Sequence, residues 1–506
     1  MVQAHTITPA ARAQIVGGLI GHAGEYGYVS QVSRSVGVSR QTLYTWEERG
    51  LRALEQTFRL APVAPVVTPA LERAILTTLV QGHAGYRGMQ ACLRAERGRA
   101  VSLGTIAVVV QEAQRRALVQ MATPVAAPVR AVALDEIYGN DRQGAYLSVV
   151  DAHSGVVWAA AGPVPVDGET WTLVLWAAQE RGLRWPRTVS DGGKAMQQAC
   201  TTVDPHGLHQ RDVWHVLHQC GTVQGRLDRR VRILQEQRAV VARQAARLAA
   251  GQRPRGCRPR SDVAAHWAQV TQAQQTADNL RYLSSELHRL LDVVVLGRDG
   301  LLDSTARHAE ITTLLALLAE LADTAPAESQ RDLRHLHQHL RQALPALLTF
   351  AVALDGIQQE MERVLGAAGL RLLAWAWQRR ALLGPTTDDL LAGLPQDWRP
   401  AARVVFHAWE SAVRASSPVE TWHSILRPHL AVHRTLSPGL LALLAVYHNH
   451  QVATRGGHAG QSPLQRSGLT DAPTDWLAAL GYPPASSASG GAAPPTRPLS
   501  TLERAA

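Results

Sequence analysis

Arg130-Ala-Val-Ala-Leu-Asp-Glu-Ile-Tyr138 is an apolar stretch that carries an acidic residue, Asp135, near its centre. Its aliphatic residues predict a buried β-strand. A carboxylate is costly to bury unless it is paired with a cation or binds a metal. We therefore interpret Asp135 as a metal ligand rather than as a strand-end acid paired with an arginine. Glu136 is the alternative ligand, but alternation along a strand places it on the opposite face.

The stretches that follow Tyr138 alternate between strand and helix patterns. Strands are predicted at 144–151 and 156–161, and the turn between them indicates antiparallel pairing. The pattern continues as helix 169–181, strand 188–190, helix 194–202 and a short strand near Leu208. Three antiparallel strands followed by βαβ units are the order of an RNase H-like α/β core, which we assign to residues 129–220.

Two further acidic residues lie in settings that suit a metal site. Asp191 ends the strand 188–190 and is followed by Gly192-Gly193, where a strand passes into a helix. Glu420 lies in Ser417-Pro-Val-Glu420, which is also the pattern of a capping box, with Ser417 as the cap. The two interpretations of Glu420 are compatible, because a catalytic acid in a first helical turn has the same sequence.

Asp135, Asp191 and Glu420 are expected to converge on one metal site. Strand ends and a later helix can bring carboxylates together, and Mg²⁺ binds through one or two carboxylates while keeping room for waters and phosphate oxygens. In a two-ion site for phosphoryl transfer with Mg²⁺ or Mn²⁺, Asp135 bridges both ions, and Asp191 and Glu420 hold one each. Glu410 is the closest rival of Glu420, which we prefer because a capped first turn fixes its direction.

The segment Tyr28-Val-Ser-Gln-Val-Ser-Arg-Ser-Val-Gly-Val-Ser-Arg-Gln-Thr-Leu-Tyr-Thr-Trp46 has the layout of a helix-turn-helix. Gly37 supplies a turn with positive φ, and Ser39 can cap the second helix. Recognition helices contact base edges near their exposed N-terminal end, which here carries Arg40, Gln41 and Tyr44. We assign residues 1–60 to a DNA-binding domain; an ordinary helical hairpin is the alternative.

Residues 66–122 repeat this pattern less clearly. Helices are predicted at 86–93 and 101–110, with Ser102 as a cap, but Val108-Val-Val110 also fits a strand. A second helix-turn-helix is therefore one of two interpretations of this segment.

The segment 221–410 has leucines at helical spacing and little strand pattern. It predicts an all-α insertion that separates the first part of the core from its last part, residues 411–470. Inside it, the basic stretch 253–260 is either a solvated hinge or a phosphate contact. Proline-rich stretches at 61–65 and 123–128 predict linkers, and the composition of the tail 483–506 predicts disorder.

The composition restricts the class of protein. The 506 residues carry a net charge of +10, with a pI of about 10.0, which predicts an anionic partner. The four cysteines show no C-x-x-C spacing and are interpreted as reduced thiols. We recognise neither a signal peptide nor a stretch that could span a bilayer. A cytoplasmic, nucleoid-associated protein without a membrane partner is expected.

In this order, the motifs resemble those of bacterial insertion-sequence transposases of the DDE, or retroviral-integrase, superfamily. Leu134-Asp135-Glu136 and Ser190-Asp191-Gly192 resemble the first two catalytic acids of the family, and Asp212-Val-Trp-His215 resembles an aspartate–aromatic–histidine segment found in some members. The stretch from Ser417 to Arg427 resembles the helix of the third acid, with His423 in place of the usual Asn. Asp191 and Glu420 lie 229 residues apart, which implies a helical insertion.

The resemblance implies a multidomain DNA transposase. Its N-terminal module would bind the terminal inverted repeats of a mobile element, and its core would cleave the strand ends and join them to target DNA, as a homo-oligomer on double-stranded DNA. We assign phosphate contacts to Lys194, the only lysine of the chain, and to Arg427. The alternatives are a catalytically inactive DNA-binding regulator derived from a transposase, and an RNase H-like nuclease acting on structured DNA or RNA.

Overall fold

The computed structural model of the chain describes residues 7–59, 67–98, 101–124, 129–139, 144–252, 263–298, 300–383, 386–455, 458–469 and 475–483. The predicted linker 61–65, most of the linker 123–128, the basic stretch 253–260 and the tail beyond Pro483 lie outside the described residues. The chain divides into two compact units, Met1–Glu72 and Arg73–Ala506.

The first unit contains α1 (Pro9–Gly21), α2 (Tyr28–Val36) and α3 (Arg40–Arg59). Leu19, Val38 and Leu43 are buried at its centre, where Val32, Val36 and Trp46 pack against them. Gly37 ends α2 in the left-handed conformation with φ of 69°, and the Ser39 hydroxyl accepts a hydrogen bond from the Thr42 amide at 3.2 Å. The predicted helix–turn–helix arrangement is thus confirmed as local structure, while DNA binding stays a prediction.

The helices α4 (Pro69–Val80), α5 (Tyr86–Arg97) and α6 (Leu103–Ala122) follow. The hydroxyl of Ser102 accepts a hydrogen bond from the Thr105 amide at 3.0 Å, so Ser102 caps α6 as predicted. Residues Val108–Val110 lie within α6, so the strand interpretation was wrong. Helix α6 packs against α18 (Pro438–His450), which ties these helices to the core of the second unit.

The second unit contains a five-stranded mixed sheet in its described residues, in the order β3-β2-β1-β4-β5. Strands β1, β2 and β3 pair antiparallel, whereas β4 and β5 join in parallel beside β1. The predicted antiparallel pairing is confirmed, and the predicted strand ends differ from the observed ones by at most three residues. The strands are β1 (Val132–Tyr138), β2 (Ala145–Asp151), β3 (Val157–Val164), β4 (Arg187–Ser190) and β5 (Leu208–Arg211).

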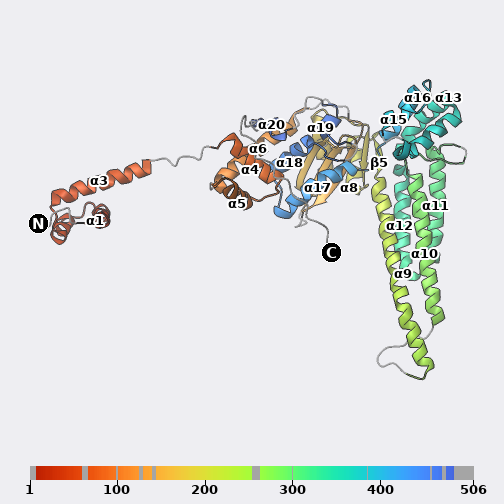
Figure 1. Ribbon diagram of the computed structural model, residues 1–506, viewed down its shortest axis with the longest axis horizontal. Helices are drawn as coiled ribbons and strands as arrows, with labels where there is room; N and C mark the ends of the chain where they lie inside the picture. The colour runs from red at the N-terminus through yellow and green to blue at the C-terminus, as the bar shows by residue number, and fades with distance from the viewer. Residues whose placement is uncertain are drawn as a thin grey trace, which may run out of the picture. The chain divides into compact units, whose positions relative to one another are not determined.

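Helices cover both faces of this sheet (Figure 1). Trp171 and Leu175 of α7 (Gly168–Glu180) and Met196 of α8 (Lys194–Val203) pack with Leu134 on one face. Because side chains alternate along a strand, Asp135 points to the other face, where α17 (Ser417–Val432) packs against β1 and β2 and α18 packs against β3. The short helices α19 (Pro463–Arg466) and α20 (Trp476–Ala479) lie against α18.

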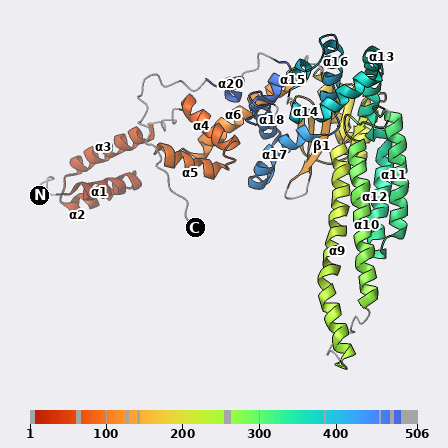
Figure 2. The ribbon, with the colours of Figure 1, turned by 45° about the vertical axis from the view of Figure 1, so that its right-hand side comes forward.

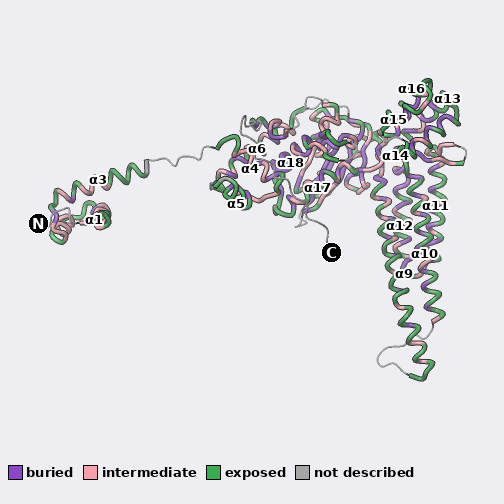
Figure 3. The backbone as a smooth tube through the Cα atoms, viewed as in Figure 1, coloured by how far each residue is buried: buried purple, intermediate pink, exposed green. Residues whose placement is uncertain are grey.

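A helical segment separates β5 from α17. Figures 1 and 2 show its long helices α9 to α12 side by side, and Figure 3 shows their buried residues facing one another. The first helix begins at Val213, earlier than the predicted boundary at 221, because Asp212 caps it. The helices are α9 (Val213–Ala249), α10 (Val263–Leu290), α11 (Ser304–Thr324), α12 (Ala327–Leu347), α13 (Thr349–Gln378), α14 (Arg380–Leu383), α15 (Thr387–Ala392) and α16 (Arg399–Glu410).

A buried glutamine joins this helical segment to the sheet. Gln210 on the edge strand β5 donates a hydrogen bond to the carbonyl of Leu347 at 2.9 Å and accepts one from the amide of Phe350 at 2.7 Å. These two groups lie at the junction of α12 and α13, so the Gln210 side chain provides hydrogen-bond partners for both backbone groups. A covered edge strand also cannot pair with another chain.

One stretch of the described residues, Ala327–Gln378, is long and apolar enough to cross a membrane by length and composition, with a mean hydropathy of 1.3. It comprises α12 and α13, and 44% of its most apolar window is buried inside the protein. Residues such as Leu340 and Leu373 pack in the helical core. Core packing therefore accounts for the apolar character of this stretch.

The buried histidine His448 predicts a pH-dependent stability. Its Nε2 atom bonds the Gly155 carbonyl at 2.9 Å, and burial lowers the pKa of the ring to about 4 from an ordinary value of 6.5. Between these pH values the unfolded chain binds more protons than the folded chain, so the free energy of unfolding falls as the pH drops from 6.5 to 4. We expect a loss on the order of 3 kcal/mol from this residue.

Urea denaturation at pH 7.5 and pH 4.5 measures this loss. The His448→Gln variant keeps a donor and removes the titrating ring, so its stability should depend less on pH than that of the wild type. The exposed His458 provides the matched control, His458→Gln. Equal pH dependence in the two variants would show that His448 does not contribute.

Candidate metal centre

Asp135 lies within β1, and only 8% of its surface is exposed. It is opposite Ser148 of β2 in the antiparallel register, and its Oδ1 atom accepts a hydrogen bond from the Glu136 amide at 2.9 Å. The strand itself therefore fixes the backbone that carries this carboxylate.

Glu420 and His423 of α17 face Asp135. One ligand atom from each of these three side chains lies within 4.8 Å of the others. The Nδ1 atom of His423 is 3.8 Å from Oδ2 of Asp135. Two of the three predicted acids are thus brought together, and His423, the residue that departs from the expected Asn, is part of the same group.

The orientation of His423 depends on a buried polar network. Its Nε2 atom lies 3.5 Å from the Ser148 hydroxyl, which also accepts a hydrogen bond from Trp422 Nε1 at 2.9 Å. Ser148 and Trp422 are both fully buried. Strand β2 therefore positions α17 so that the next residue along the helix, His423, points at Asp135.

Asp191 stands beside this group but not within it. It follows β4, and its Oδ1 atom accepts a hydrogen bond from the Gly193 amide at 2.8 Å. Gly192 has a φ of 76°, a left-handed conformation that glycine adopts without strain, so this position in the turn favours glycine. The charge of Asp191 raises the pKa of Asp135, which places the two carboxylates in one electrostatic neighbourhood.

Burial and neighbouring negative charges make the Asp135 carboxyl group reluctant to ionise. Burial, with smaller contributions from the charges of Asp191 and Glu420, raises the pKa of Asp135 to about 6, although the Glu136 amide and His215 oppose the change. A bound cation would relieve this repulsion. The observed set of two carboxylates and one imidazole therefore fits a divalent cation, with Asp191 as a further carboxylate close by.

Glu136 is closer to the site than the sequence indicated. Burial raises its pKa to about 7, and the charges of Asp191 and Asp135 add to that effect. Its Oε2 atom is buried without a hydrogen-bond partner among the described residues. Alternation along β1 does direct it away from α17, but β4 ends nearby and brings Asp191 close to it. Sequence reasoning missed this because it considered β1 without its neighbour.

A second buried acid, Asp212, joins three elements behind the site. Its Oδ1 atom accepts hydrogen bonds from the amides of Trp214 and His215 and so caps α9. Its Oδ2 atom accepts bonds from the amide and hydroxyl of Ser416 and lies 3.1 Å from Nδ1 of His215. The segment Asp212–His215, noted in the sequence only for its resemblance, therefore fixes the start of α17.

The pKa values of two histidines at the site are shifted in opposite directions. The carboxylate of Asp212 raises the pKa of His215, burial opposes the change, and Asp135 and Asp191 raise the pKa further. In contrast, burial lowers the pKa of His423 to about 4, although Glu420 partly offsets this. The ring from α17 is therefore neutral near neutral pH, whereas the nearby acids stabilise the protonated form of the ring from α9.

The start of α17 corrects one prediction. Ser416, not Ser417, precedes the first helical residue, and its side chain bonds Asp212 instead of capping the helix. The predicted capping box is therefore absent, and Glu420 is free of that local role. Its Oε2 atom accepts a bond from Arg427 at 2.7 Å, so Arg427 faces the acid in this structure.

The rival acid Glu410 lies elsewhere. It ends α16, is exposed, and accepts a hydrogen bond from the Thr387 hydroxyl at 3.4 Å. Lys194, predicted to contact phosphate, is exposed at the first position of α8, three residues after Asp191. Among its described residues, the helical segment contributes no ligand atom to the group at Asp135, although its residue His215 lies beside that group.

The side chains predicted to read DNA are exposed on the first unit. Arg40 and Gln41 open α3, and 55% of the surface of Tyr44 is exposed. The guanidinium of Arg40 reaches the Ser30 hydroxyl of α2 at 3.4 Å. All three side chains are thus accessible to a partner. Among the described residues, the side chains of Gln41 and Tyr44 form no hydrogen bond.

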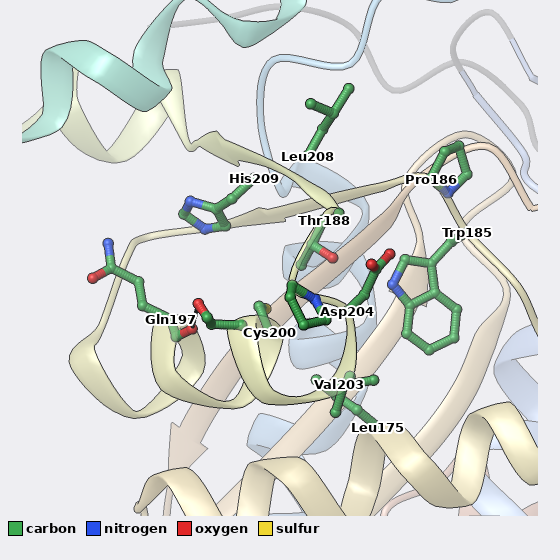
Figure 4. Close-up of a pocket in the computed structure, with 13 residues that line it drawn as sticks. Leu175, Trp185, Pro186, Thr188, Gln197, Cys200, Val203, Asp204, Leu208 and His209 are labelled. Carbon is green, nitrogen blue, oxygen red and sulfur yellow. Dashed lines mark hydrogen bonds between the residues drawn. The ribbon is translucent and has the colours of Figure 1, made fainter.

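A cavity of about 260 Å³ lies beside α8 (Figure 4), and its lining includes none of Asp135, Asp191 and Glu420. Its lining includes Cys200 and His209, whose Nε2 atom lies 2.8 Å from the Ser190 hydroxyl. Burial raises the pKa of the Cys200 thiol to about 11, which makes it a poor nucleophile. The cysteines and histidines between 200 and 220 form no metal-binding group in the described part of the chain.

A comparison with protein-family models finds no match to this chain, and a comparison with curated proteins finds no match either.

Proposed function

We propose that this protein is a DNA transposase of the DDE type, which cleaves and joins DNA strands by metal-dependent phosphoryl transfer. The observation that carries the proposal is the meeting of Asp135 and Glu420, 285 residues apart in the chain, with His423 at one point and with Asp191 beside them. The mixed sheet, with three antiparallel strands and two parallel ones, has the order expected of an RNase H-like core and supports the proposal.

The donor set suits Mg²⁺ or Mn²⁺. Asp135, Glu420 and Asp191 offer carboxylate oxygens, the ligands that both ions prefer, and His423 adds a nitrogen that favours Mn²⁺ over Mg²⁺. When bound, a pair of such ions would neutralise the phosphate and activate the attacking water or 3′-hydroxyl.

The remaining residues of the site supply positive charge and keep the neighbouring side chains in position. Asp212 keeps His215 beside the acids, where a protonated ring can bind a phosphate oxygen. Arg427 pairs with Glu420 in the structure and can exchange this partner for phosphate once Glu420 binds a cation. Lys194, exposed near Asp191, can contact the same DNA backbone.

The helix-turn-helix of the first unit would supply specificity for terminal inverted repeats, and the second unit would supply chemistry on those ends and on target DNA. The net charge of +10 supports a nucleic-acid partner. A homo-oligomer on DNA and a cytoplasmic location are part of the same proposal.

Plasmid cleavage tests the proposed activity. A supercoiled plasmid carrying the coding region with its flanks is incubated with the protein and Mg²⁺, Mn²⁺ or EDTA. We expect nicks or double-strand breaks at short inverted repeats in the presence of either ion and none with EDTA. Sequence-specific binding without any cleavage would favour the inactive regulator, and cleavage confined to branched DNA or RNA would favour the nuclease.

Recognition of the ends is predicted to depend on the start of α3. The Arg40→Ala/Gln41→Ala variant should lose on the order of 1–3 kcal/mol of specific binding per base contact removed. Nonspecific binding should change little because other arginines supply it. Competition gel shifts with end sequence and random duplex measure the difference.

The exposed Arg49, farther along α3, gives the control Arg49→Ala, which also removes one positive charge. If the double variant still prefers the end sequence as strongly as this control, the recognition helix lies elsewhere.

A further inference from the structure

Basic side chains gather around a cavity at the end of the sheet opposite the acids. The cavity has a volume of about 230 Å³ and is lined by Arg130, His153 and Arg187, together with Ser411. Arg130 precedes β1 and Arg187 begins β4, whereas Asp135 and Asp191 lie farther along the same two strands. Ala131, the lining residue nearest to Asp135 along this part of the chain, precedes it by four positions, which corresponds to about 13 Å of extended strand.

Arg187 is the best-placed of these groups to hold a ligand. Burial lowers the pKa of its guanidinium, and its Nε atom is buried without a hydrogen-bond partner among the described residues. A buried Nε–H without a partner is costly. The Arg187 side chain also lines the cavity, where an anion would give its guanidinium a partner of opposite charge.

The neighbouring groups are also basic. The guanidinium of Arg130 reaches Nε2 of His407 at 3.4 Å. Burial lowers the pKa of His153, and Arg130, Arg187 and His407 lower it further, which shows that their charges act on one place.

None of the described residues lining the cavity is acidic. The carboxylate of Asp151, outside the lining, opposes the decrease in the pKa of His153. Its Oδ1 atom already accepts hydrogen bonds from the amides of His153 and Ser154, at 2.8 and 2.9 Å. The two arginines therefore have no carboxylate partner inside the cavity.

We propose that this cavity is a binding site for the phosphate group of a phosphate ester or diester, separate from the metal centre. Two guanidinium groups match the oxygens of a phosphate, because arginine binds such groups through paired hydrogen bonds. A cavity of about 230 Å³ has room for a phosphate group. The ligand is therefore the backbone phosphate of DNA, if the proposed function holds, or else a free phosphate ester.

The first measurement needs no DNA. The melting temperature of the full chain is followed with sodium phosphate and with sodium chloride at equal ionic strength. We expect phosphate to raise the melting temperature of the wild type and to bind the Arg187→Met variant at least tenfold more weakly. Methionine keeps apolar contacts at this half-buried position, and Arg130→Gln provides a second variant at an exposed position should the first fail to fold.

The second measurement identifies the source of the phosphate. The salt dependence of duplex binding is compared for the wild type, Arg187→Met and the control Arg184→Gln, an exposed arginine three residues earlier that is not part of the lining. Loss of one DNA phosphate contact should reduce the slope by about 1 in Arg187→Met alone. If Arg187→Met is no longer stabilised by phosphate but its DNA binding keeps the salt dependence of the wild type, the site binds a small phosphate ester instead.

The outcome that would overturn the site is a wild type that phosphate stabilises no more than chloride does, together with equal DNA slopes for all three proteins. Failure of the proposed function looks different. In that case DNA is not cleaved in the plasmid assay, but phosphate still stabilises the wild type and not Arg187→Met.

Discussion

Replacement of Asp135 by asparagine is expected to abolish metal-dependent cleavage of DNA while leaving end binding intact. Asparagine keeps the shape of the side chain but removes the charge that holds a divalent cation at the point shared with Glu420 and His423. A cation at a reacting phosphate contributes several kcal/mol to transition-state stabilisation, so we expect a decrease in rate on the order of 1,000-fold or more. Asp191→Asn and Glu420→Gln should behave in the same way.

The measurements separate this effect from misfolding. Cleavage is followed on a labelled duplex of the element end, binding of Mn²⁺ by calorimetry, and end binding by gel shift. Glu410→Gln is the matched control, because Glu410 is an exposed acid ten residues before Glu420 and lies outside the metal-binding group. Wild-type cleavage by any of the three acid variants would remove that acid from the site, and loss of cleavage by the control would undo the choice of Glu420.

The Asp212→Ala variant is expected to show the largest loss of stability. Asp212 is 1% exposed, and burial alone would raise its pKa, but hydrogen bonds from His215 and Ser416 outweigh burial and lower it. Alanine would leave the amides of Trp214 and Ser416 without the partners they have at 2.7 and 2.8 Å. Removing one member of a buried, charged network costs roughly 3–5 kcal/mol in the free energy of unfolding.

Chemical denaturation of the second unit measures this cost. Asp278→Asn is the control, since Asp278 is an exposed acid on α10 that pairs with Arg281 on the surface, where an ion pair contributes little to stability. The same Asp212→Ala variant should also cleave DNA poorly, because Ser416 starts the helix that carries Glu420. A variant as stable as the control would show that the start of α17 is held by other contacts.

The sequence by itself determined local elements of this protein, among them the strand that carries Asp135. The turn at Gly37, the caps at Ser39 and Ser102 and the strand around Asp135 were all predicted, and the structure confirms each of them as local structure. Each depends on groups within about four residues of one another, where residue type and spacing suffice. Antiparallel pairing of the first three strands was predicted for the same reason, since a short turn joins β2 to β3.

Only the tertiary structure decided which distant groups share the site. The sequence already preferred Glu420 to Glu410, but for a capping box that is absent from the structure. The meeting of Glu420 and His423 with Asp135, and the bond between Asp212 and Ser416, 204 residues apart, depend on how α17 packs on β1 and β2. The sequence missed the proximity of Glu136 to the site for a similar reason, because the end of β4 brings Asp191 near it. Sequence spacing carries no information about such pairs, since a long helical segment separates them and packing alone sets their distance. The cavity of Arg130 and Arg187 likewise exists only because β1 and β4 are neighbours in the sheet.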